Sequence, residues 1–193
     1  MTRTTLYKGV YFAMLGGYLV LFVTVLVHFR FSPFALVALI VAYLIPGRIL
    51  GFFWRDLLRG LRLLNAKDYP QSKFYSKRFL SYVRRRPWIK NLVWLGSSTY
   101  SRDPEVLAFN NLGAAEIQLG ELDSARIHLD FAIKMDGLCP LPFHNMGVLA
   151  VAMNDEAEAD RCFAQAYRLG YRQDLSDKII RASQTRFANT DGR

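Results

Sequence analysis

The sequence predicts an all-α protein, in which an N-terminal two-helix transmembrane hairpin is followed by a short helical solenoid and a C-terminal capping helix. Three observations predict this fold. Two long apolar runs lie near the N-terminus, amphipathic segments with helical spacing follow them, and a 34-residue repeat occupies the second half of the chain. The charges are unevenly distributed along the chain, because all sixteen Asp and Glu come after Trp54. Of the 193 residues, 52% are hydrophobic, and the long apolar runs precede the acids.

Residues 1–54 are predicted to form the transmembrane hairpin. Residues 10–29 are twenty positions without a charge, and residues 31–47, or 31–53 on the widest count, form a second apolar run. A helix needs roughly 20 apolar residues to span a bilayer. The first run is too long for the apolar core of a signal peptide, and the short link around Arg30 predicts an antiparallel pair. A buried core helix is the alternative for the first run.

The basic residues beside these runs predict the orientation. Arg30 alone lies in the link, whereas Arg3 and Lys8 precede the first run and several bases follow the second. Basic residues favour the cytoplasmic side of membrane helices. We therefore expect a multi-pass integral membrane protein of the inner (cytoplasmic) membrane of a bacterium, with both termini in the cytoplasm.

Residues 55–103 are predicted to form basic helices beside the membrane and to contain a degenerate copy of the repeat. Residues 55–102 have twelve Lys or Arg against Asp56 and Asp68. Amphipathic helices are expected over 49–66 and 72–86, and Pro87 ends the second. The inward-facing residues of the second helix are expected to be Phe74, Phe79, Leu80 and Val83.

The arginines of this region are candidate lipid contacts. Phe52, Phe53 and Trp54 suit the interface of a bilayer, where aromatic side chains gather. Bases near that interface attract anionic lipid headgroups. Solvated helix ends, at which the bases complement the helix dipole, are the alternative. The expected lipid-facing basic collar consists of Arg55, Arg59, Arg62, Arg84, Arg85 and Arg86.

The composition argues against several classes of function. Residues 103–193 have nine bases and fourteen acids, which is unlike a nucleic-acid-binding surface. Cys139 and Cys162 lack metal-ligand spacing, and His128 is expected at a surface or an edge. The sequence has no phosphate-binding loop, nucleophile motif or paired carboxylates. We therefore expect no nucleic acid, metal, cofactor or enzymatic activity.

A 34-residue repeat defines residues 104–187. The segment 108–113 aligns with 142–147, and both segments end in glycine. The match continues at Ala125, Leu129 and Ala132 in the first copy and at Ala159, Phe163 and Ala166 in the second. These residues at this period resemble the tetratricopeptide repeat (TPR) family, which implies pairs of antiparallel helices that cross closely at the glycine.

The resemblance also implies the extent of the solenoid. Two copies cover about 104–170, and a weaker copy is expected over 56–87, with Leu63 where the family has glycine. Residues 88–101 are expected to form an extra helix that closes the stack. Residues 174–187 are expected to be the capping helix, and residues 188–193 a frayed tail.

By the same resemblance, the first helix of each repeat lines a groove for a protein partner. Asn111 and Asn145 are equivalent, and this family uses such amides to hydrogen-bond a peptide backbone, although Asn is also common there without a peptide. The groove has no Lys or Arg, so an apolar helix or an extended peptide is the expected ligand. Residues 88–96 of the chain itself are another candidate occupant. The expected groove residues are Leu107, Asn110, Asn111, Ala114, Ile117, Gln118, Leu141, His144, Asn145, Val148 and Val151.

These features together predict a membrane-anchored scaffold or adaptor that binds a protein partner. The alternative is an accessory subunit of a membrane enzyme or export complex, docked through the hairpin. The sequence fixes neither the identity of the partner nor the oligomeric state.

Overall fold

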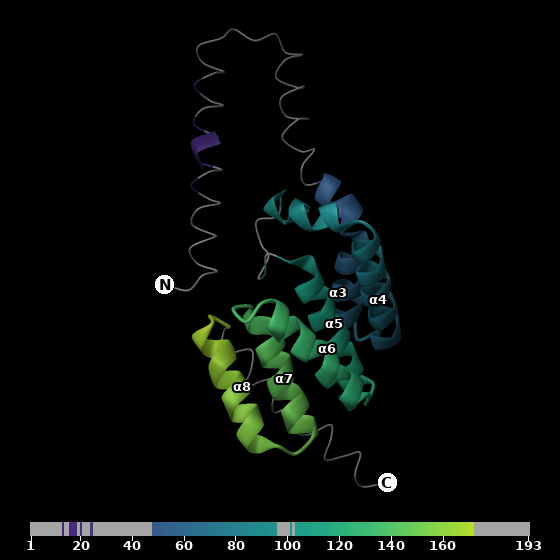
Figure 1. The fold of residues 1–193 in the computed structure, drawn as a ribbon, viewed down its shortest axis with the longest axis vertical. Coiled ribbons are helices and arrows are strands. Elements are labelled where there is room, and N and C mark those ends of the chain that lie inside the picture. The colour runs from purple at the N-terminus through teal and green to yellow at the C-terminus, as the bar shows by residue number, and fades with distance from the viewer. Residues whose placement is uncertain are drawn as a thin grey trace.

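The computed structural model describes residues 48–95, 101 and 103–171, together with isolated positions at 13, 16–18, 20 and 24. Every regular element in these residues is a helix, so the all-α prediction is confirmed for them (Figure 1). The predicted capping helix over 174–187 and the tail over 188–193 lie outside the described residues.

The expected localisation needs correction. In the part of the chain that the structure describes, no helix has both the length and the apolar character needed to cross a membrane. The longest of these helices has 17 residues and is rich in Lys and Arg. This finding contradicts the expectation of a multi-pass integral membrane protein, which we do not retain. Most of the two apolar runs, 10–29 and 31–47, lies outside the described residues.

The described helices form three antiparallel hairpins that pack side by side (Figure 1). The first helices of the hairpins are α3 (Arg55–Asn65), α5 (Pro104–Gln118) and α7 (Pro140–Ala152), and the second helices are α4 (Tyr69–Arg85), α6 (Leu122–Met135) and α8 (Glu156–Arg168). Each later first helix contacts both helices of the hairpin before it: α5 packs on α3 and α4, and α7 packs on α5 and α6.

Side chains at the helix starts fix where several helices begin. Asp68, Asp103 and Asp155 each accept a hydrogen bond from a backbone N–H in the following turn. Proline occupies the first position of α5 and α7, where no intrahelical N–H bond is needed. The predicted helix over 72–86 is therefore confirmed, with its start moved back to Tyr69.

The first helix of each hairpin ends in the same backbone motif. Lys67, Gly120 and Asn154 follow α3, α5 and α7 in the left-handed conformation, with φ of 63°, 77° and 59°. In each case the next amide donates to the carbonyl five residues earlier at 2.9 Å, and the pairs are Asp68 with Leu63, Glu121 with Glu116, and Asp155 with Ala150. This is the Schellman arrangement. Lys67, Gly120 and Asn154 are therefore equivalent positions of the three hairpins, separated by 53 and 34 residues, and this equivalence defines the structural register.

A glycine marks the closest approach of the two helices in each hairpin. A Cβ atom added to Gly113 would lie 2.6 Å from Leu129 Cγ, and one added to Gly147 would lie 2.6 Å from Phe163 Cε1. In the first hairpin, a Cβ atom on Gly60 would lie 3.0 Å from Ser76 Oγ. Each glycine faces the residue sixteen positions later, so the crossing is equivalent in all three hairpins.

This register corrects the alignment of the first hairpin. Leu63 was expected at the glycine position, but Gly60 occupies it. The offset between Gly60 and Gly113 exceeds the 34-residue period by 19 residues, which contain the 3₁₀-helix η1 (Pro87–Leu95). Within the described part of residues 88–101, the expected extra helix is thus a 3₁₀-helix that ends at Leu95.

The insertion is attached to its neighbours by polar contacts. Lys90 of η1 lies 2.9 Å from an Asp103 oxygen and 3.2 Å from a Glu105 oxygen, at the start of α5. Ser101 Oγ donates to Asp136 at 2.7 Å, after the end of α6. Lys90 and Ser101 are therefore both attached to the second hairpin.

The hydrophobic core runs through the hairpins, with two departures from the predicted pattern. Phe79, Leu80 and Val83 of α4 are buried as expected, but Phe74 is 54% exposed because it lies on the opposite face of the helix. Trp54, expected at a membrane interface, is 2% exposed and packs in the core beside Leu57.

A side chain added at Gly147, where the two helices of the third hairpin cross, should destabilise the fold. Gly147→Leu should reduce the free energy of unfolding by about 1–3 kcal/mol, because Phe163 occupies the required space. Gly51→Ala is the control: none of the described residues lies within 4 Å of its added Cβ, and Ala should be neutral or stabilise by about 0.5–1 kcal/mol in a helix. Chemical denaturation measures both, and equal effects would contradict the crossing.

Candidate functional site

The residues predicted to line the groove form two neighbouring rows, on α5 and α7. The half-buried members are Leu107, Ala114, Gln118, Leu141, Asn145 and Val151, and the buried members are Asn110, Asn111, Ile117, His144 and Val148. Ile117 and Val148 both pack in the core with Leu149, so neither contributes to the surface. The surface between the two rows is therefore made of small, aliphatic and amide side chains.

An amide pair joins the two rows. Asn145 Nδ2 donates to Asn110 Oδ1 at 2.8 Å, from α7 to α5. Asn111, the repeat equivalent of Asn145, is itself only 4% exposed. Asn145 remains half-buried and is thus the more accessible of the two equivalent amides. The hydrogen bond holds its side chain in place against α5.

His144 is buried next to this amide pair. Its ring lies 4.3 Å from that of Tyr171 and 5.6 Å from that of Phe163, measured between centroids. The Nδ1 atom is 3.4 Å from Asn145 Oδ1, and among the described residues Nε2 has no hydrogen-bond partner. Burial lowers the pKa of His144, because desolvation disfavours the charged ring. The site therefore contains a neutral imidazole with one unused polar atom.

The α3 helix presents a third row that the predicted groove omitted. Leu58, Leu61 and Asn65 stand 53 residues before Asn111, Ala114 and Gln118 and are equivalent to them in the structural register. Leu58 is 38% exposed and Leu61 is 42% exposed. The 19-residue insertion hid this equivalence, since a constant period of 34 residues counted back from Gly113 arrives at Phe79, and the weaker copy was instead aligned with Leu63 at the position of Gly60.

A buried ionic cluster lies on the other side of α5. Glu116 is fully buried, its Oε2 atom is 2.6 Å from His128 Nδ1, and its Oε1 atom is 3.8 Å from Lys73 Nζ. Lys73 also pairs with Glu121. The cluster therefore links α4, α5 and α6. The sequence analysis placed His128 at a surface or an edge and assigned no role to Glu116.

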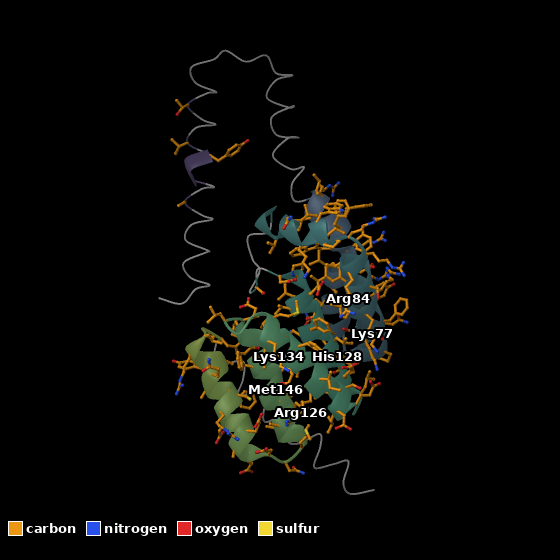
Figure 2. The ribbon with its side chains drawn as sticks, viewed as in Figure 1. Lys77, Arg84, Arg126, His128, Lys134 and Met146 are labelled. Carbon is orange, nitrogen blue, oxygen red and sulfur yellow. The ribbon has the colours of Figure 1, made fainter. Side chains whose placement is uncertain are left out.

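The basic collar is divided among several environments. Arg84 comes from α4 and His128 from α6 (Figure 2). Arg84 Cζ lies 5.9 Å from the centre of the Phe109 ring, and His128 stacks on the same ring. Arg59 lies 4.6 Å from the Tyr75 ring, and Arg86 donates to Tyr82 Oη at 3.1 Å. All six members of the collar are exposed, including Arg55, Arg62 and Arg85. Contact of the collar with anionic lipid headgroups stays a prediction.

The two cysteines are in unreactive surroundings. Burial raises the pKa of the Cys139 thiol to about 12, and burial followed by the nearby Glu158 charge raises the pKa of Cys162. Both thiols are therefore protonated at neutral pH. Among the described residues, no group of three or more His, Cys, Asp or Glu side chains is placed to hold a metal ion.

Comparison of the chain with models of protein families, with curated proteins and with solved structures finds no match. The resemblance to the tetratricopeptide repeat family thus rests on the residues of this chain alone.

The buried imidazole predicts a pH dependence of stability. Because the folded pKa of His144 lies below its ordinary value of 6.5, the unfolded chain takes up the proton first as the pH falls. This contribution to stability is complete above about pH 6.5 and decreases below it. His144→Phe should therefore melt with a weaker pH dependence between pH 7.5 and 5.5 than the wild type. Parallel pH profiles of the two proteins would show that His144 is not the group responsible.

Proposed function

We propose that this chain is a tetratricopeptide-like adaptor that binds a segment of a protein partner along its first helices. The repeated glycine crossings and the repeated Schellman motifs support a solenoid of this kind. So does the packing of α5 on both α3 and α4, and of α7 on both α5 and α6. An array built in this way presents its first helices together on one face.

The observation that carries the proposal is the Asn145–Asn110 amide pair, which joins two rows of half-buried and buried side chains. A fixed amide beside aliphatic side chains suits an extended peptide, whose backbone needs hydrogen bonds while its side chains need apolar contacts. The Oδ1 atom of Asn145 faces His144 Nδ1 at 3.4 Å, whereas its Nδ2 group has a second N–H beyond the one that it donates to Asn110. An apolar helix is the other ligand that fits these rows.

A second candidate function is that of an accessory subunit in an enzyme or export complex. The exposed apolar side chains on the outer surface of α6 favour it. Ile127 is 56% exposed, Phe131 is 52% exposed and Met135 is 39% exposed, and their spacing of four residues places them on one helix face. A face of this kind is typical of a permanent contact with another subunit.

Substitutions on the two faces distinguish these functions. Asn145→Ala should lower the melting temperature by a few degrees, because the buried Asn110 loses its hydrogen-bond donor at a cost of about 1–3 kcal/mol. It should also lower the recovery of a co-purifying protein about tenfold or more from the folded variant, since a peptide group of the partner would lose a hydrogen bond of similar value. Ile127→Ser with Phe131→Ser is the matched control on α6. Recovery that survives Asn145→Ala but is lost in the α6 variant would support the subunit function and contradict the adaptor function.

A further inference from the structure

The face formed by the first helices extends beyond the two clear repeats, onto α3. Lys67 matches Gly120 and Asn154 in backbone conformation, and Gly60 matches Gly113 in its close approach. The helix α3 also packs against α5, as α5 packs against α7 (Figure 1). The third row, Leu58 with Leu61 and Asn65, is therefore continuous with the rows on α5 and α7.

The α3 row differs in its chemistry from the other two. Its equivalents on α5 are Asn111 and Ala114, whereas Leu58 and Leu61 expose large apolar side chains. Residues three apart lie on one helix face, so the two leucines form one apolar surface. More than a third of the possible surface of each leucine is exposed to solvent. Burial of this apolar surface against a partner would therefore be favourable.

Exposed arginines flank this apolar surface. Arg62 stands four residues after Leu58, and Arg55 stands three before it, so both lie beside the leucines on the helix surface. The side chain of Arg55 is 68% exposed, and its Nε atom lies 3.9 Å from Asp56 Oδ1. Asp56, the only acid in α3, is already held by Arg78, whose Nε donates to it at 2.7 Å. Arg55 therefore shares Asp56 with Arg78, and a net positive charge remains beside the leucines for an external carboxylate.

We propose that the partner segment is both acidic and apolar: its apolar side chains pack on Leu58 and Leu61, and Asp or Glu residues beside them face Arg55 and Arg62. This inference rests on the proposed function and adds the chemistry of the ligand to it. Charge complementarity selects the occupant, because residues 48–95 have twelve Lys or Arg against two Asp. The row on α7 then receives the other end of the segment, near the amide of Asn145.

The test is peptide selection on the full-length chain, using a random peptide library displayed on phage. The expected peptides combine Leu, Ile or Phe with Asp or Glu. A selected peptide, labelled with a fluorophore, is then titrated against the variants. Leu58→Ser with Leu61→Ser should weaken binding by about tenfold or more, since two apolar contacts are lost. Arg55→Gln with Arg62→Gln should weaken it about two- to fivefold at low salt and less at high salt.

The control variants separate this inference from the proposed function. Ile127→Ser with Phe131→Ser, on α6, should leave binding unchanged. If Asn145→Ala weakens binding and the two α3 variants do not, the adaptor function stands and the α3 inference is wrong. If the α6 variant alone removes binding, both are wrong. Selected peptides without acidic residues would overturn the inference. Self-association of the free chain would also overturn it if the variant Leu58→Ser with Leu61→Ser no longer self-associates. The occupant of the α3 row would then be a second copy of this chain.

Discussion

The arrangement of this protein depends on the close crossing of two helices at a glycine in each hairpin. At Gly113 and Gly147 the space that a side chain would need is taken by Leu129 and Phe163. The first hairpin keeps the same crossing with different chemistry, because Ser72 Oγ donates to the Gly60 carbonyl oxygen at 2.9 Å. Since each hairpin has the same crossing, the hairpins stack alike and their first helices form one face.

Opposite charges hold the first hairpin on the second. Residues 48–95 have twelve Lys or Arg against two Asp, and residues 103–171 have four against eleven Asp or Glu. Lys73 meets Glu116 and Glu121 across the α4–α5 boundary, and Lys90 meets the acids at the start of α5. An exposed pair contributes only about 0–1 kcal/mol, but the buried Glu116 requires a partner more strongly. We interpreted the excess of Lys and Arg in residues 55–102 as a sign of a membrane-facing region. Part of this excess instead pairs with acids of the neighbouring hairpin.

The second and third hairpins could be predicted from the sequence because nothing interrupts their period. The alignment of 108–113 with 142–147 places Gly113 and Gly147 correctly. The first hairpin could not be placed, since the 19 inserted residues and the left-handed Lys67, in place of a glycine, remove the usual signals. The same error hid Leu58 and Leu61. Burial of Trp54 and the pairing of Glu116 with His128 depend on contacts between distant segments, which a local pattern does not contain.

The central claim is that the first hairpin is a third repeat in register with the other two. Spin labels at Asn65, Gln118 and Ala152, introduced in pairs after replacement of Cys139 and Cys162 by Ser, test it by distance measurement. These three positions are equivalent at offsets of 53 and 34 residues. The account predicts narrow distributions at similar distances for the Asn65–Gln118 and Gln118–Ala152 pairs, and a longer distance for Asn65–Ala152. A broad Asn65–Gln118 distribution, or one centred far from that of Gln118–Ala152, would contradict it.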